Sequence, residues 1–253
     1  DMPPLTAITT ANGDVLVTWQ SEDLFNADGN GSAVVSVLIR TQTSAGNDTL
    51  RGGDGDDTLF GMGADDLLEG ENNDDTLHGG SGNDDLRGGS GDDTLFGNDD
   101  DDDLEGGAGA DALDGGAGTD RASYFGSSTG IDLLMESTGP TGSVWGAFVN
   151  TSAGGYAGDA LGDTLTSIEA LTGSTFDDRI FGTSTGIDVA LLGGNDDFSV
   201  SASSTGSDSV SGGSGNDRIF TGGGDAFLYG EDGDDILEGD NGSDELYGMN
   251  DND

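Results

Sequence analysis

Aspartate recurs every nine residues along much of this sequence, and a row of carboxylates at that spacing could bind cations. From Gly52 the copies read GGDGDDTLF, GMGADDLLE, GENNDDTLH, GGSGNDDLR, GGSGDDTLF, GNDDDDDLE, GGAGADALD and GGAGTDRAS. Position 1 is glycine and position 6 is aspartate in each of these copies. Carboxylates at this density repel one another unless positive charge lies between them. The pattern therefore indicates repeated sites for a cation that prefers oxygen ligands.

The position-6 aspartates form two arrays, and the second array follows the repeat less strictly. In the first array and the partial copy before it they are Asp48, Asp57, Asp66, Asp75, Asp84, Asp93, Asp102, Asp111 and Asp120. In the second array they are Asp178, Asp196, Asp208, Asp217, Asp235 and Asp244. Ile187 and Ala226 fall where an aspartate is expected, and an insertion lengthens the step from Asp196 to Asp208. We expect weakened or missing cation sites at these places.

Glycines at positions 1, 2 and 4 permit unusual backbone conformations and leave the carbonyl oxygens bare of side chains. The glycines expected to contribute are Gly52, Gly53, Gly55, Gly79, Gly80, Gly82, Gly88, Gly89, Gly91, Gly106, Gly107, Gly109, Gly212, Gly213 and Gly215. Calcium takes about six to eight oxygen ligands in flexible geometry, so carbonyls of two adjacent turns and the position-6 carboxylates can complete its shell. Magnesium fits poorly because it demands tight octahedral geometry and keeps its waters. The predicted cofactor is therefore Ca²⁺, with multiple ions per chain.

The composition agrees with a chain that needs cations to fold. Among 253 residues there are 51 acidic and six basic ones, which gives a formal net charge of -45. Such a chain repels nucleic acid and anionic membranes, and it stays disordered unless something neutralises it. Cysteine is absent, so disulfides and thiolate metal sites are excluded, and no apolar run is long enough to span a membrane. We predict a chain that is disordered without calcium and folded with it.

A fixed period of nine residues predicts a repeat architecture, because each copy must stack on its neighbours to bury its apolar residue. That residue stands at position 8, as Leu50, Leu59, Leu68, Leu77, Leu86, Leu95, Leu104 and Leu113 in the first array. The sequence resembles the RTX family, whose consensus is GGxGxDxUx with U a large apolar residue. The resemblance implies an all-β fold, a right-handed parallel β-roll or β-solenoid. In it, positions 1 to 6 form a turn, positions 7 to 9 form a strand, and two copies complete one coil. It also implies that each ion lies between turns eighteen residues apart, as between Asp57 and Asp75.

The chain divides into four segments by its repeat pattern. They are an N-terminal β-hairpin segment at 1–44, the first array at 45–123, a spacer at 124–172 and the second array at 173–253. The hairpin is predicted from DVLVTW at 14–19 and VVSVLIR at 34–40. Glu169 and Leu171 are already in phase with the second array, so we expect the solenoid to continue through longer coils in the spacer.

Positions 7 and 9 are expected to face solvent and to stack every eighteen residues. The predicted stacks are Arg51, Glu69, Arg87 and Glu105; Thr58, Thr76 and Thr94; Phe60, His78 and Phe96; and Tyr229 with Tyr247. The aromatic stacks have two interpretations, contact with a glycan or a protein, and cross-strand stacking for stability, which we favour. Three threonine rungs flanked by aromatic rings make too short and irregular a face for us to expect ice binding.

Catalysis by a Ser/His/Asp or Cys/His arrangement needs a base beside a nucleophile. Cysteine is absent, and His78, the only histidine, occupies an exposed position 9, so we expect no catalytic site. Two functions are compatible with the sequence. We favour a secreted structural or adhesive element, such as a surface layer, stalk or filament, with end-to-end self-association. The alternative is the secretion and folding module of a larger secreted enzyme or toxin. In both cases the resemblance implies type I secretion, with folding in the calcium outside the cell or at the bacterial surface.

Overall fold

The computed structural model of the chain is an all-β parallel solenoid of about nine coils. It describes the backbone of residues 6–9, 15–21, 33–39, 46–137, 145–148, 159–182, 186–200 and 206–250. Side chains are described for 46–134, 159–182, 186–200 and 206–250. These ranges contain no helix, and hence none that could cross a membrane.

Each nonapeptide contributes one strand, and in most copies of the first array that strand is longer than the sequence predicts. In the copy that begins at Gly52, the strand β5 (Thr58–Gly63) runs from position 7 to position 3 of the next copy. The prediction of a strand at positions 7 to 9 is wrong for these copies and is confirmed for others, such as Arg121–Ser123 and Arg218–Phe220. Position 1 stays in the strand because its glycine is extended and buried between coils, and the chain bends only at positions 4 to 6. Position 8 is buried between two half-buried neighbours, as the period of two requires.

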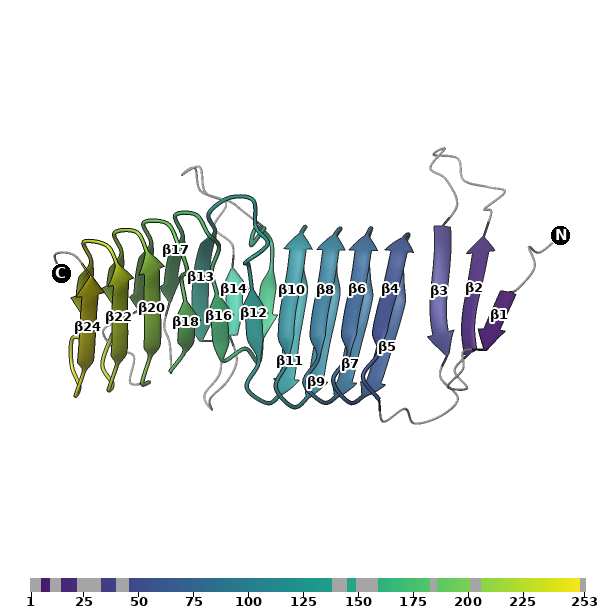
Figure 1. Cartoon of the computed structure of the whole chain (residues 1–253), viewed down its shortest axis with the longest axis horizontal. Helices are drawn as coiled ribbons and strands as arrows, with labels where there is room; N and C mark the ends of the chain where they lie inside the picture. Colours follow the sequence, from purple (N-terminus) through teal and green to yellow (C-terminus); the bar gives the residue numbers. More distant parts are fainter. Residues whose placement is uncertain are drawn as a thin grey trace.

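Successive strands alternate between two sheets, so that two copies make one coil. Leu59 pairs with Leu77, and Leu68 with Leu86, both eighteen residues apart, as the resemblance implies. One sheet has ten parallel strands along the solenoid (Figure 1). In spatial order they are β4 (Thr49–Asp54), β6 (Leu67–Asn72), β8 (Asp85–Ser90), β10 (Asp103–Ala108), β12 (Arg121–Ser123), β16 (Ala170–Thr172), β18 (Asp188–Ala190), β20 (Ser209–Ser214), β22 (Phe227–Asp232) and β24 (Glu245–Asn250).

Two shorter sheets face the ten-stranded sheet, one after the other. The eight-stranded sheet contains β1 (Thr6–Thr9), β2 (Val15–Ser21), β3 (Ala33–Ile39), β5, β7 (Thr76–Ser81), β9 (Thr94–Asp99), β11 (Ala112–Ala117) and β15 (Thr164–Thr166). The six-stranded sheet contains β14 (Trp145–Phe148), β13 (Asp132–Ser137), β17 (Arg179–Gly182), β19 (Asp197–Val200), β21 (Arg218–Phe220) and β23 (Ile236–Glu238). The spacer thus supplies the last strand of one sheet and the first strands of the other. The ten-stranded sheet continues past it, because β12 pairs with β16.

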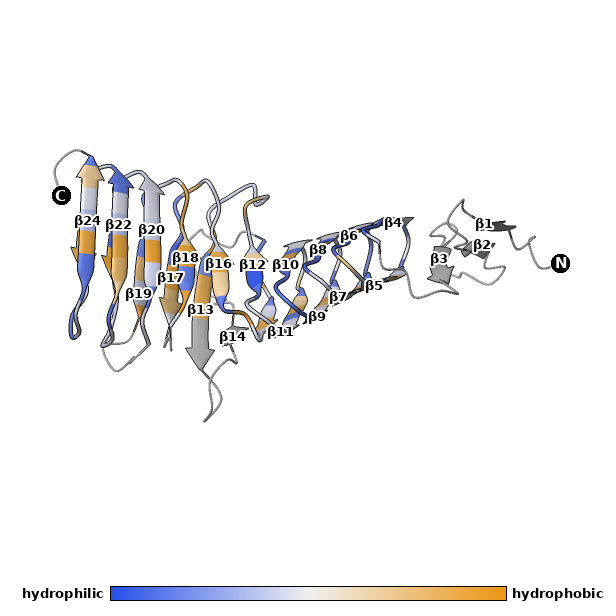
Figure 2. Cartoon of the chain, turned by 60° about the horizontal axis from the view of Figure 1, so that its bottom comes forward, coloured by the Kyte–Doolittle hydropathy of each residue, from blue (hydrophilic) through white to orange (hydrophobic). Residues whose placement is uncertain are grey.

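The core is a column of position-8 side chains between the sheets. Leu68, Leu77, Leu86, Leu95 and Leu104 are fully buried, and the column continues through the spacer and the second array. Figure 2 shows apolar residues at the same level of β20, β22 and β24, as a stacked column requires. One large apolar side chain per nine residues makes a narrow core, so the turns on either side must contribute to stability.

At the N-terminal end, β1, β2 and β3 pair antiparallel, and Val37 of β3 pairs with Thr58 of β5. Residues 22–32, the loop of the predicted hairpin, lie outside the described residues. The N-terminal hairpin therefore stays a prediction. The right-handedness of the coil, which the resemblance implies, also stays a prediction.

Candidate calcium sites

The position-6 aspartates lie in the turns with their carboxylates turned inward. Asp75, Asp84, Asp93, Asp102 and Asp111 are at most 3% exposed. In each of them Oδ1 accepts a hydrogen bond from the backbone N–H of the aspartate eighteen residues earlier, at 2.7 to 2.8 Å. The structure therefore joins the pairs that the resemblance implies, such as Asp57 with Asp75, through a direct hydrogen bond between coils.

The second carboxylate oxygen, Oδ2, is buried without a hydrogen-bond donor along both arrays. Within the described part of the chain this holds for Asp75, Asp84, Asp93, Asp102, Asp111, Asp120, Asp196 and Asp217. An ionised oxygen buried without a partner is costly, and a coordinated cation is one way to remove the cost. The row of such atoms is the feature of the structure that best fits bound ions.

In the first array, each unpaired oxygen faces a small space that a position-1 glycine keeps open. A Cβ atom added at Gly70 would meet Oδ2 of Asp75 and the carbonyl oxygen of Gly88 in the next coil. At Gly88 it would meet Oδ2 of Asp93 and the carbonyl oxygen of Gly106. A carboxylate oxygen and a carbonyl oxygen of two successive coils thus converge where a side chain is missing.

Positions 2 and 4 have a different reason for glycine, which is a positive φ. Gly53 and Gly55 have φ of 104° and 114°, and the other predicted glycines at these positions share the sign. The residues Met62, Ala64, Glu71 and Asn73 adopt the same conformation where a copy lacks glycine. The turn geometry is therefore kept in copies that depart from the consensus.

The oxygen atoms that converge in the turns suit calcium as ligands. They are carboxylate and carbonyl oxygens only, and calcium accepts many oxygen ligands in flexible geometry. Among the described residues, no three His, Cys, Asp or Glu side chains come together as a metal site. Each ion would therefore be held by a position-6 carboxylate and by backbone carbonyls such as those of position-1 glycines.

Burial raises the pKa of these carboxyl groups. The pKa rises from 3.8 to about 7 for Asp75 and Asp102, and to about 8 for Asp196. Desolvation is the main cause in each, a backbone hydrogen bond opposes it, and neighbouring carboxylates add to it. The turns thus favour either a proton or a cation at each aspartate.

In the spacer two acidic residues occupy the place of the position-6 aspartate. Asp163 Oδ1 accepts from the N–H of Asp111 at 2.9 Å, and Glu169 Oε2 accepts from the N–H of Asp120 at 3.0 Å. The phase of Glu169 was visible in the sequence, whereas our sequence analysis missed Asp163. Its signal was the run Asp163, Thr164, Leu165, which repeats the Asp-Thr-Leu of Asp57 to Leu59.

The second array keeps the same contacts with local changes. The N–H of Asp196 donates to Asp217 across 21 residues, so the insertion lengthens this coil without breaking the row. Ile187 and Ala226, which lack a carboxylate, still donate their N–H groups to Asp208 and Asp244.

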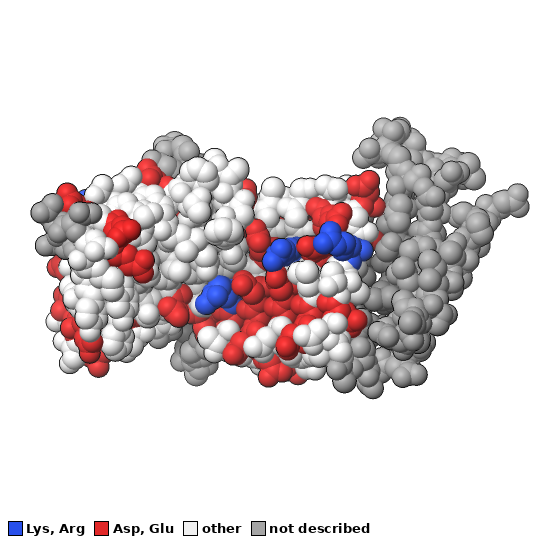
Figure 3. Space-filling view, viewed as in Figure 1, with Lys and Arg blue, Asp and Glu red and all other residues white. Residues whose placement is uncertain are grey.

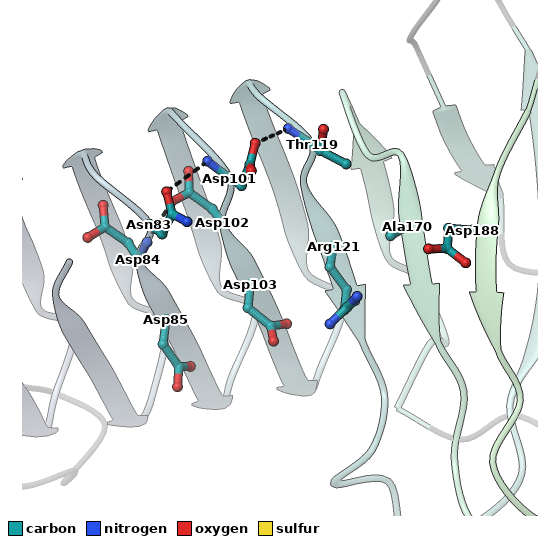
Figure 4. A pocket seen from close by; sticks show the side chains of 10 residues that line it. All are labelled: Asn83, Asp84, Asp85, Asp101, Asp102, Asp103, Thr119, Arg121, Ala170 and Asp188. Atoms are coloured by element: carbon teal, nitrogen blue, oxygen red, sulfur yellow. Dashed lines mark hydrogen bonds between the residues drawn. The ribbon is translucent and has the colours of Figure 1, made fainter.

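Position 5 forms a further row of side chains that the sequence analysis missed. Asn83 donates its N–H to Asp65 at 3.0 Å. Asp101 donates to Asn83 at 3.4 Å, and Thr119 to Asp101 at 2.8 Å (Figure 4). This row runs opposite to the position-6 row, because each N–H finds its acceptor in the preceding coil. Asp and Asn at position 5 were a readable signal, since a short side chain with an oxygen is what the contact needs.

Beside this row, the ten-stranded sheet carries a surface depression of about 480 Å³. Asp85, Asp103 and Asp188 line it with Arg121, as Figure 4 shows. In Figure 3 the acidic side chains gather over the first array, with a few arginines among them. The depression therefore belongs to the same acidic surface as the turns.

Three of the four predicted surface stacks are confirmed in full and one in part. Thr58 pairs with Thr76, and Thr76 with Thr94, in adjacent strands. Phe60, His78 and Phe96 stack with ring centroids 4.8 and 4.7 Å apart, and Tyr229 stacks on Tyr247 at 5.2 Å. In the charge stack, Arg51 binds Glu69 at 2.7 Å. Arg87 instead binds Asp85 of its own strand at 2.7 Å, because the two side chains lie on the same face of β8.

The comparison with known families agrees with this geometry. A model of the RTX calcium-binding nonapeptide repeat, four copies long, matches residues 42–77, 61–95, 78–113, 87–122, 192–228 and 221–253. Together these matches cover more than half of the chain. A search of curated proteins found no match. The chain belongs to the family of proteins with RTX calcium-binding nonapeptide repeats.

Proposed function

We propose that the chain is a calcium-dependent structural or adhesive element that works outside the cell, as part of a surface layer, stalk or filament. The row of buried Oδ2 atoms without donors carries this proposal, because it makes the folded form depend on the ions between its coils. The net charge of -45 adds to that dependence, since the carboxylates repel one another when no ion is bound.

The outer faces support a structural role. Arg51 pairs with Glu69, and position-5 residues bind one another from coil to coil. His78, the only histidine, is stacked between two phenylalanine rings, where burial lowers its pKa. Because the single histidine is part of this aromatic stack, the proposal includes no catalysis by the element itself.

Secretion is part of the proposal. A chain that folds only with calcium stays unfolded in the calcium-poor cytoplasm, which suits export by the type I route that RTX repeats typically follow. Extracellular calcium modules bind at roughly 10⁻⁴ to 10⁻³ M, and outside calcium then completes the fold.

A calcium titration monitored by circular dichroism tests the proposal. We expect a disordered spectrum in chelator and a cooperative gain of β-structure with a midpoint in roughly the 10⁻⁴ to 10⁻³ M range. A spectrum rich in β-structure in chelator, or a nanomolar midpoint, would contradict it. The complete gene separates this role from the alternative of a folding module, since a catalytic domain encoded beside the repeats would favour the alternative.

A further inference from the structure

Two buried aspartates, Asp163 in the spacer and Asp178 at the start of the second array, differ from the eight with an unpaired Oδ2. Asp163 precedes β15, the last strand of the eight-stranded sheet, and Asp178 precedes β17, the second parallel strand of the six-stranded sheet. Both are at most 1% exposed, and both accept a backbone N–H on Oδ1 as the regular aspartates do. The difference lies in the other oxygen.

Oδ2 of Asp163 accepts a hydrogen bond from the hydroxyl of Tyr124 at 2.9 Å. The tyrosine is 2% exposed and belongs to the hydrophobic core. Its backbone is fixed in turn, because its N–H donates to the carbonyl of Thr172 and its carbonyl accepts from Ser127. The hydroxyl is therefore held in the position where the regular coils leave Oδ2 open.

Oδ2 of Asp178 accepts from the backbone N–H of Ser174 at 2.7 Å, and Oδ1 accepts from the hydroxyl of the same serine at 2.6 Å. Together with the N–H of Ile131, three donors satisfy this carboxylate. Ser174 is fully buried and occupies position 2, which is glycine in most regular copies. The contact is local, four residues along the chain, so it forms with the turn itself.

A donor hydrogen and a calcium ion compete for the same lone pairs, because the partial positive charge of the hydrogen repels the cation. We propose that Asp163 and Asp178 bind no calcium, and that Tyr124 and Ser174 replace the ion at these two positions. Of the two rows of position-6 residues, the one that runs through Asp111, Asp163 and Asp178 then lacks ions at the spacer, whereas the other row passes the spacer through Asp120 and Glu169. The inference rests on calcium binding at the regular positions.

Counting bound calcium tests this inference. The measurement is ions per chain after equilibrium dialysis at saturating calcium, for the wild-type chain, Asp163→Asn and the matched control Asp93→Asn. The control loses an ion ligand, so we expect its count to fall by at least one. An asparagine at 163 still accepts from Asp111 and can hydrogen-bond Tyr124, so we expect the wild-type count. A loss of ions in Asp163→Asn overturns the inference, whereas an unchanged count in Asp93→Asn contradicts the calcium sites themselves.

A second variant decides the question if Asp163→Asn does not fold. Tyr124→Phe keeps the carboxylate and removes only the hydroxyl. If Tyr124 is the partner of Asp163, its loss leaves a buried charge without a donor, and the calcium midpoint of folding moves to higher concentration by several-fold. An unchanged midpoint would show that an ion satisfies Asp163, and it would overturn the inference.

Discussion

Single residues in the turn show why glycine recurs at three positions for two different reasons. Gly88 at position 1 has no positive φ, but a Cβ there would meet Asp93 and the carbonyl of Gly106. Gly53 at position 2 has a φ of 104°, and a Cβ there would meet nothing within 4 Å. Position 1 therefore protects the space for the ion, whereas Gly53 serves the backbone conformation alone. At Gly80 and Gly89, the same position in later coils, a Cβ would also meet the backbone of the preceding coil.

Gly88→Ala and Gly53→Ala separate these two roles. The methyl group at 88 displaces Asp93 from the ion, so we expect the chain to bind at least one calcium fewer and its midpoint to rise. The change at 53 adds only left-handed strain of about 1 to 2 kcal/mol. We expect it to lower the free energy of unfolding with the calcium count unchanged. Dialysis and denaturant titrations measure both quantities, and equal ion counts in the two variants would refute the distinction.

The raised pKa values of the turn aspartates predict that acid partly replaces calcium. The pKa is about 6 for Asp93, about 7 for Asp75 and about 8 for Asp196 in the fold, against 3.8 ordinarily. The folded form then binds more protons than the unfolded chain between these values, so its stability falls as pH rises. The stabilisation of the fold by protons on these carboxyl groups is complete below about pH 4, and it is lost as pH rises through 6 to 8.

In calcium-free buffer we therefore expect the β-structure signal to grow as pH is lowered from 8 to 5. The same protons stabilise the fold when calcium is present, so less calcium is needed, and the calcium midpoint of folding should move downward on acidification. Circular dichroism at several pH values measures both effects. A calcium-free chain that is equally disordered at pH 5 and pH 8 would argue against the buried carboxylates as the cause.

At the scale of elements, the repeat predicted the eighteen-residue register and the stacks well, because each depends on residues two copies apart. It did not predict that the spacer ends one sheet and starts another. That change lies in a segment without the period, where contacts such as that of Tyr124 with Asp163 join residues 39 apart. The position-5 row was missed for another reason, since its side chains look like surface charge until adjacent coils are seen together.

The aromatic stack on the eight-stranded sheet should contribute measurably to stability. His78 lies between Phe60 and Phe96, with interplanar angles of 1° and 5°. His78→Ala removes two ring contacts, each worth roughly 0.5 to 1.5 kcal/mol, so we expect a loss of about 1 to 3 kcal/mol. His78→Phe keeps the stack and should unfold at the wild-type denaturant concentration or above it. Denaturant unfolding at saturating calcium compares the two, and an unaffected alanine variant would mean that the rings stack without stabilising.

At the scale of the whole molecule, folding brings the acidic residues closer together than any disordered chain would. The position-6 carboxylates lie in rows that repeat from coil to coil, and further acidic residues line the surface over the first array (Figure 3). Their mutual repulsion opposes folding at every coil, and it weakens only where positive charge is bound between them. The fold and its ions therefore form a single equilibrium, in which the affinity for calcium and the stability of the solenoid change together.

This coupling predicts that calcium compacts the chain and that magnesium does not. A disordered chain of 253 residues has a radius of gyration of about 55 Å. Adding calcium should lower it in one cooperative step, measured by small-angle X-ray scattering. Magnesium at equal concentration screens the charges equally but keeps its waters and rejects the carbonyl-rich sites, so only slight compaction should follow. Sodium chloride at matched ionic strength controls for screening. Equal compaction by magnesium would mean that general charge neutralisation, and not coordination in the turns, folds the solenoid.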